Sequence, residues 1–295
     1  MVPSLVRRAL AALPLALGMP MALAGPCAED DAGERVCLDA PAERIVALSP
    51  GATELLFEAG AGERVVAAVS HADYPEAAGA LPRVGSYDRL DLESILAKEP
   101  DLAVGWGTGN PEHQLRDLAE LGVPVYISEP RELEDVATTL ERLGRLAGTA
   151  EAAGEAAAAF RERRDAIAER YAGREPVTVF YQIWADPVMT INDEQIISES
   201  IRLCGGENVF GDLDRLTPRL DRESVLDADP EAIVAGGMGE ADDAWLDGWR
   251  RFDGMRAVRE GHLFFIEPST IQRPTPRLLE GTEVLCRKLD RVRDD

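Results

Sequence analysis

The chain of 295 residues has few of the patterns that mark an enzyme or a metal site. It contains only 3 histidines and 4 cysteines. We find no CxxC spacing, no pair of histidines spaced for zinc, no nucleophile elbow and no glycine loop that would cradle a phosphate. The sequence therefore lacks the residue constellation that an enzyme needs, and we expect no catalytic residues, no catalytic cofactor and no resident metal.

Basic residues are also scarce. Lys and Arg number 31 against 54 Asp and Glu, which gives a formal net charge of −23. A strongly acidic chain repels the phosphate backbone, so nucleic acid is excluded as a partner. The acidic residues are spread along the whole chain, which is typical of a solvated surface rather than of one binding patch.

Long apolar runs are absent beyond the N-terminus, where no segment approaches the roughly 20 apolar residues of a membrane span. The N-terminus has Arg7 and Arg8, a proline-broken apolar run and the small-x-small end Ala22-Leu23-Ala24. This pattern predicts a cleavable signal peptide over residues 1–24. The surrounding residues fit a twin-arginine signal poorly, and Pro26 disfavours lipid attachment at the first cysteine. We expect ordinary secretion into a periplasm.

One motif occurs twice, at positions 91 and 221, 130 residues apart. Asp91-Leu92-Glu93-Ser94 and Asp221-Arg222-Glu223-Ser224 each precede a proline and an apolar run at equal offsets. Each copy predicts a short helix with Asp at its N-cap and Glu in its first turn, followed by a strand. The duplication predicts two similar lobes in which Glu93 and Glu223 are exposed at matching positions, where a partner could contact both. The alternative is that each Glu only stabilises its own helix.

Strand and helix signals alternate on both sides of a helical middle region. We expect an N-terminal hairpin over 25–43, an α/β lobe over 44–131, a helical region over 132–172 and a second α/β lobe over 173–295. The long helix from about 149 to 171 separates the two motif copies. Within the first lobe, Ser49-Pro50-Gly51-Ala52 predicts a turn before a helix. The fold class is thus α/β, with mostly parallel sheets in two similar lobes.

In an exported chain, cysteines without metal spacing are expected to form disulfides. Four cysteines allow three pairings. We favour Cys27 with Cys37, which closes the N-terminal hairpin, and Cys204 with Cys286, which ties the closing helix to the second lobe.

This organisation resembles the periplasmic substrate-binding proteins of ABC importers whose lobes are bridged by one rigid helix, and which serve the import of cobalamin, haem and iron-siderophores. The chain is most similar to the cobalamin-binding members, from about Arg44 to the end. The residues that carry the resemblance are Arg44 to Pro50 with Thr53-Glu54, Asp73-Tyr74-Pro75, Leu92-Glu93 with Pro100-Asp101-Leu102, Trp106 with Gly109-Asn110, Cys204 to Phe210, Arg222-Glu223, Arg273 with Pro276-Arg277, and Leu285-Cys286.

The resemblance implies a monomer that holds a corrinoid in a cleft between the lobes, with little hinge closure. It implies that Glu93 and Glu223 pair with arginines of an inner-membrane permease, an arrangement that would fix the docking register. The alternative ligands are haem and a ferric siderophore. A more distant alternative is a secreted enzyme that has kept the fold, because fold alone does not fix function.

Several residues are candidates for the cleft. Trp106 and Trp184 end predicted strands, where α/β proteins bind ligands, although each could instead be a packing residue. By resemblance, Tyr87 and Trp106 match positions that line the corrin pocket, and Arg273 matches an arginine that contacts the ligand. A wall of rings with a few polar groups suits a large, flat, mainly apolar ligand.

Two departures from the family affect the choice of ligand. The segment that ends at Gln272 replaces a more acidic and aromatic ligand loop. His71 stands where the cobalamin-binding members have a pocket tyrosine, and an imidazole can ligate cobalt or haem iron. A lone histidine more often forms hydrogen bonds only.

Overall fold

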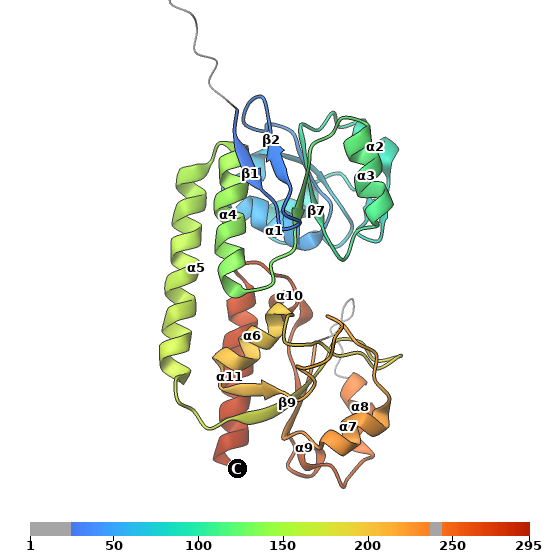
Figure 1. Ribbon diagram of the computed structural model, residues 1–295, viewed down its shortest axis with the longest axis vertical. Helices are drawn as coiled ribbons and strands as arrows, with labels where there is room; N and C mark the ends of the chain where they lie inside the picture. Colours follow the sequence, from blue (N-terminus) through green and yellow to red (C-terminus); the bar gives the residue numbers. More distant parts are fainter. Residues whose placement is uncertain (1–24, 237–243) are drawn as a thin grey trace, which may run out of the picture.

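The computed structural model describes residues 25–236 and 244–295, so the expected signal peptide lies outside the described residues. Two α/β lobes follow one another along the long axis of the molecule, and α5 (Ala150–Tyr171) runs beside them (Figure 1). Its buried side chains, which include Phe160 and Ile167, belong to the same core as residues of both lobes. Across the part of the chain that is described, no helix combines the length and apolar character needed to cross a membrane.

Each lobe contains a four-stranded parallel sheet, and the two sheets have the same topology. The first is ordered β4-β3-β7-β8 and the second β10-β9-β11-β12, so the first strand of each sheet lies between the second and third. This identity supports the predicted duplication. The strands are β3 (Ile45–Ala47), β4 (Val65–Ala68), β7 (Leu102–Trp106), β8 (Val125–Ser128), β9 (Val177–Gln182), β10 (Gly206–Asn208), β11 (Ala232–Ala235) and β12 (Leu263–Phe265).

Helices cover these sheets, and two small hairpins complete the first lobe. The hairpins are β1 (Cys27–Glu29) with β2 (Arg35–Cys37), and β5 (Gly85–Ser86) with β6 (Arg89–Leu90). The other helices are α1 (Pro50–Glu58), α2 (Leu92–Leu96), α3 (Glu112–Glu120), α4 (Leu133–Ala147), α6 (Ile196–Leu203), α7 (Arg222–Ala228), α8 (Ala244–Arg250), α9 (Arg256–Arg259), α10 (Pro268–Ile271) and α11 (Leu278–Asp294), with short 3-10 turns at Gly62–Arg64 and Glu76–Ala80.

Both expected disulfides are confirmed. Cys27 and Cys37 join β1 to β2, and Cys204 at the end of α6 joins Cys286 in α11. The second bond connects elements that are 82 residues apart in sequence, so it closes most of the C-terminal lobe into one loop.

The duplicated motif has the same local geometry in both lobes. The carboxylate of Asp91 accepts a hydrogen bond from the backbone N–H of Ser94 at 3.1 Å, and that of Asp221 accepts one from Ser224 at 2.7 Å. The two helices therefore begin where the N-cap rule predicts.

The acidic residue after each proline anchors the first strand of its own sheet. Asp101 accepts hydrogen bonds from the backbone N–H groups of Glu43 and Arg44, just before β3. Glu231 accepts from the N–H and hydroxyl of Thr178 in β9. The repeat is thus a complete structural unit that links helix, strand and sheet.

The predicted turn at Ser49 to Ala52 is wrong. Ser49 is the N-cap of α1, because its hydroxyl accepts the N–H of Ala52 at 3.0 Å, and Pro50 is the first helical residue. Proline is tolerated there because its missing N–H would have had no partner in the helix. The loop after β3 is consequently short, and it places Ser49 at the edge of the sheet that faces the other lobe.

Candidate functional site

A cavity of about 360 Å³ lies where the two lobes meet. It lies at the carboxyl ends of the parallel strands, where the crevice of α/β sheets binds ligands. The structure brings all the predicted cleft residues together there. These are His71, Tyr87, Trp106, Trp184, Gln272 and Arg273.

The N-terminal lobe contributes a pair of aromatic rings, which we call the aromatic wall: Tyr87, from the β5–β6 hairpin, and Trp106, the last residue of β7. Their ring centroids are 5.6 Å apart and the ring planes are inclined by 47°. Burial, followed by the charge of Asp88, raises the pKa of the Tyr87 hydroxyl, so this group stays a neutral hydrogen-bonding group. The wall offers an apolar surface with a polar edge.

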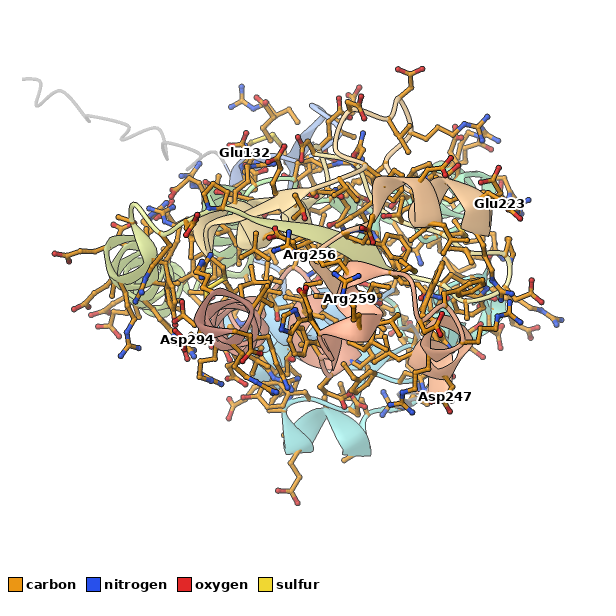
Figure 2. All side chains as sticks on the ribbon, turned by 90° about the horizontal axis from the view of Figure 1, so that it is seen from below. Glu132, Glu223, Asp247, Arg256, Arg259 and Asp294 are labelled. Carbon is orange, nitrogen blue, oxygen red and sulfur yellow. A yellow bond between two sulfur atoms is a disulfide. The ribbon has the colours of Figure 1, made fainter. Side chains whose placement is uncertain are left out.

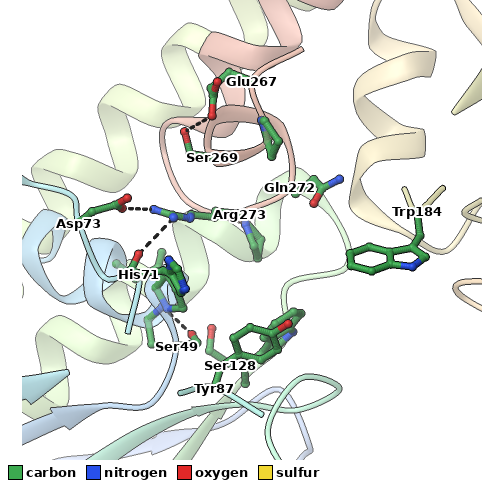
Figure 3. A pocket seen from close by; sticks show the side chains of 17 residues that line it. Ser49, His71, Asp73, Tyr87, Ser128, Trp184, Glu267, Ser269, Gln272 and Arg273 are labelled. Carbon is green, nitrogen blue, oxygen red and sulfur yellow. Dashed lines mark hydrogen bonds and ion pairs between the residues drawn. The ribbon is translucent and has the colours of Figure 1, made fainter. Parts of the chain in front are cut away.

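The C-terminal lobe contributes a more isolated ring. Trp184 follows β9 and is 39% exposed, which is high for a tryptophan. Its indole N–H donates to the backbone carbonyl of Asp186 at 3.0 Å, and its ring meets Trp245 edge to face at 5.7 Å. Figure 3 shows the ring of Trp184 on the opposite side of the cavity from Arg273.

Arg273 crosses from the C-terminal lobe to the N-terminal lobe beside the cavity. One guanidinium nitrogen donates to Glu54 at 2.7 Å. The same nitrogen donates to Asp73 at 2.9 Å, and the other donates to the backbone carbonyl of His71 at 3.2 Å (Figure 3). The guanidinium therefore joins the two faces of the cleft. Although burial acts to raise it, the hydrogen bond and charge of Arg273 lower the pKa of Asp73.

Glu54 is the buried end of this contact, and its side chain is 1% exposed. It also accepts hydrogen bonds from Thr275 at 2.9 Å and Arg277 at 3.3 Å, so one carboxylate of α1 holds three side chains of the other lobe. Burial raises the pKa of Glu54 against the opposing effect of Arg273. In the sequence, Glu54 stands out as an acidic residue inside the apolar run of α1. The predicted site did not include it.

Polar groups missed by the sequence reasoning also line the cavity. Ser49, Ser128 and Glu267 add two hydroxyls and a carboxylate to the imidazole of His71. His71 itself is exposed and has a backbone φ of 64°, which is unusual for a residue other than glycine. Within residues 25–236 and 244–295, no group of three or more His, Cys, Asp or Glu side chains is arranged to hold a metal ion.

Glu93 and Glu223 lie outside the cavity, in the first turns of α2 and α7. Both are exposed, and among the described residues neither side chain forms a salt bridge. Figure 1 shows α2 and α7 on the side of their lobes that faces away from α5, and Figure 2 shows Glu223 at the periphery of the molecule. The two carboxylates are therefore free to contact another protein.

Known proteins are similar to this chain in sequence and fold. The chain is 34% identical over 253 residues to a vitamin B12-binding protein of Vibrio parahaemolyticus, covering 86% of this chain and 91% of that protein. A crystal structure of a periplasmic vitamin B12-binding protein of Vibrio cholerae matches with a TM-score of 0.80 and 33% identity, over 86% of this chain and 99% of that one. A periplasmic heme-binding protein of Roseiflexus has the same fold, with a TM-score of 0.74 and 24% identity, over 85% and 98% of the two chains.

The family described as periplasmic binding protein matches residues 45–270, which contain both sheets, α5 and most of the residues that line the cavity. Both Vibrio relatives are described as binding proteins. The chain belongs to the periplasmic binding protein family.

Proposed function

We propose that this chain captures cobalamin or a related corrinoid in the periplasm and delivers it to the permease of an ABC importer. The observation that carries the proposal is the cavity between the lobes, with the aromatic wall on the N-terminal lobe and Trp184 on the C-terminal lobe. The names of the Vibrio relatives support the choice of ligand. On this view the chain acts as a secreted monomer without catalysis, its two lobes are the units over 44–131 and 173–295, and residues 1–24 are removed on export.

The chemistry of the cavity suits a corrinoid. A flat macrocycle packs against aromatic faces, and its peripheral amides need hydrogen-bonding partners, which Gln272, Ser128 and Glu267 supply. Arg273 has a second role in this proposal, because its guanidinium joins the lobes while one face borders the ligand. A corrinoid is larger than the cavity of about 360 Å³, so we expect its side chains to project from the cleft.

A second candidate ligand is haem, and the observation that favours it is His71. The imidazole lines the cavity and could ligate iron, or the cobalt of a corrinoid that lacks its own lower base. Both ligands would pack against the same aromatic side chains. The two proposals differ in whether His71 ligates the metal and in which polar side chains of the cavity contact the ligand.

Titration of the purified protein with cyanocobalamin, cobinamide and haemin, followed by calorimetry and absorption spectra, tests these proposals. We expect both corrinoids to bind more tightly than haemin. Trp106→Ala should weaken their binding by at least about tenfold, because burying a large apolar side chain contributes about 1.5–3 kcal/mol. Tight haemin binding with a shifted Soret band that His71→Ala removes would favour the second ligand. The corrinoid assignment fails if neither corrinoid binds.

The proposed docking surface consists of Glu93 and Glu223. Their equivalent positions at exposed helix starts suit two matching arginines on a permease with two similar subunits. Charges of this kind mainly fix orientation and encounter rate, so the ligand cleft should not depend on them.

A further inference from the structure

Asn110 is a buried amide at the junction between β7 and α3, and it is 6% exposed. Its side chain makes three hydrogen bonds. The oxygen Oδ1 accepts from the backbone N–H of Trp106 at 2.6 Å, while Nδ2 donates to the carbonyl of Leu48 at 2.8 Å and to the carbonyl of Tyr87 at 2.7 Å. One side chain therefore ties three segments that are far apart in sequence.

All three segments carry the N-terminal face of the cavity. Leu48 precedes Ser49, and Ser49, Tyr87 and Trp106 all line the cavity. We propose that Asn110 is a positioning residue for ligand binding, which sets the spacing and tilt of the aromatic wall without contacting the ligand itself. This inference rests on the proposed function, because it assigns a role within that binding site.

The pattern of bonds demands an asparagine. Two carbonyls and one N–H converge on the site, so the central side chain must supply two donors and one acceptor over a short reach. Aspartate keeps the acceptor but has no donor when ionised, and serine has a single donor. Without Nδ2, the carbonyls of Leu48 and Tyr87 lose this partner in a buried place, which favours a shift of the backbone.

The surrounding loop leaves the Trp106 ring few alternatives. A Cβ added at Gly109 would lie 1.9 Å from the ring, so the ring packs directly on the glycine backbone. Glu129 accepts the N–H of Thr108 at 2.7 Å and holds the middle of the same loop. The ring is therefore placed by its backbone, and Asn110 fixes that backbone relative to Tyr87.

The C-terminal lobe provides a matched control in Asn208, which is 8% exposed. Its Nδ2 donates to the carbonyl of Ile191 at 2.9 Å and to the hydroxyl of Ser198 at 3.0 Å, and its Oδ1 accepts from the N–H of Phe210 at 3.1 Å. The Asn208 side chain donates and accepts as many hydrogen bonds as that of Asn110, and none of its three partners lines the cavity.

The test compares Asn110→Ala, the isosteric Asn110→Asp and Asn208→Ala in protein labelled with 5-fluorotryptophan. Trp106→Phe assigns the Trp106 resonance among the four tryptophans. In the ¹⁹F NMR spectrum of the ligand-free protein, we expect both Asn110 variants to shift or broaden the Trp106 resonance. Asn208→Ala should leave this resonance unchanged, although it should lower the melting temperature of the protein. Cobinamide affinity should fall at least tenfold in the Asn110 variants only.

The proposal is overturned if the Trp106 resonance and the affinity of both Asn110 variants match the wild type, or if Asn208→Ala reduces affinity as strongly. If the wild type binds neither corrinoid, the proposed function fails, and the Trp106 resonance in the ligand-free protein then decides the role of Asn110 by itself.

Discussion

The N-terminal sheet β4-β3-β7-β8 and the C-terminal sheet β10-β9-β11-β12 follow the chain in the same order, yet they present different groups to the cavity between them. The first presents the paired rings of Tyr87 and Trp106. The second presents the exposed Trp184 and the polar side chains of Gln272 and Arg273. Because the scaffolds match, the differences lie in loops at the carboxyl ends of the strands, where an α/β fold can change its ligand without changing its core.

The lobes are alike in the helix start and the strand anchor of the repeat. Asp101 and Glu231 bind the first strands, and Glu93 and Glu223 are exposed in the first helical turns. They differ in how they are stabilised. The N-terminal lobe has a disulfide across a small hairpin, and the C-terminal lobe has one between two helices. This comparison indicates that a common ancestral unit supplied the scaffold and the exposed first-turn glutamates, while each lobe gained its own cross-links and cleft residues.

The largest expected difference between the lobes is in their disulfides. Cys204→Ala with Cys286→Ala should lower the free energy of unfolding by about 4 kcal/mol, because the bond spans 82 residues, whereas Cys27→Ala with Cys37→Ala should cost about 3 kcal/mol for a span of 10. Urea unfolding followed by circular dichroism measures both. Each double variant serves as the control for the other. A larger decrease in the free energy of unfolding for the hairpin variant would contradict the loop-entropy argument.

A smaller effect is expected at the proposed docking residues Glu93 and Glu223, where the lobes should behave alike. Glu93→Ala and Glu223→Ala should each weaken binding of the loaded protein to its permease by about tenfold, and the double variant by about a hundredfold, because distant sites add. The affinity of each loaded variant for the permease is measured with the permease in lipid nanodiscs. The affinity of each variant for cobinamide should stay at the wild-type value.

Glu112→Ala is the matched control, since Glu112 is also an exposed first-turn glutamate in the N-terminal lobe. A double variant that docks and supports uptake as well as Glu112→Ala would remove the docking assignment and leave both glutamates as helix stabilisers.

The sequence predicted the repeated unit and the two strand-end tryptophans of the cavity from local signals. The disulfides followed from export and cysteine spacing, and Tyr87, His71 and Arg273 followed from resemblance to the family. Trp106 and Trp184, for example, follow apolar strands, and strand ends converge in an α/β lobe. The contact between Glu54 and Arg273 could not be predicted from local pattern, since 219 residues separate them and only the packing of the two lobes brings them together. The predicted turn at Ser49 failed because Ser-Pro-Gly is compatible with a turn and with a helix start, and the hydrogen bond to Ala52 selects the helix.

The smallest expected effect tests the equivalence of the two repeats most directly. Hydrogen bonds from Ser94 and Ser224 lower the pKa of Asp91 and Asp221 below the ordinary value of 3.8. A carboxyl group whose pKa is depressed on folding stabilises the fold above its unfolded pKa, and that contribution is lost as the pH falls through the folded pKa.

Ser94→Ala and Ser224→Ala should therefore raise the two pKa values by similar amounts, as followed by carboxyl carbon NMR titration. Ser86→Ala removes a hydroxyl that donates to Asp88 in the same lobe, so it should leave Asp91 unchanged. Unequal responses of Asp91 and Asp221 would show that the two helix starts, and with them the exposed glutamates Glu93 and Glu223, are not held in equivalent ways.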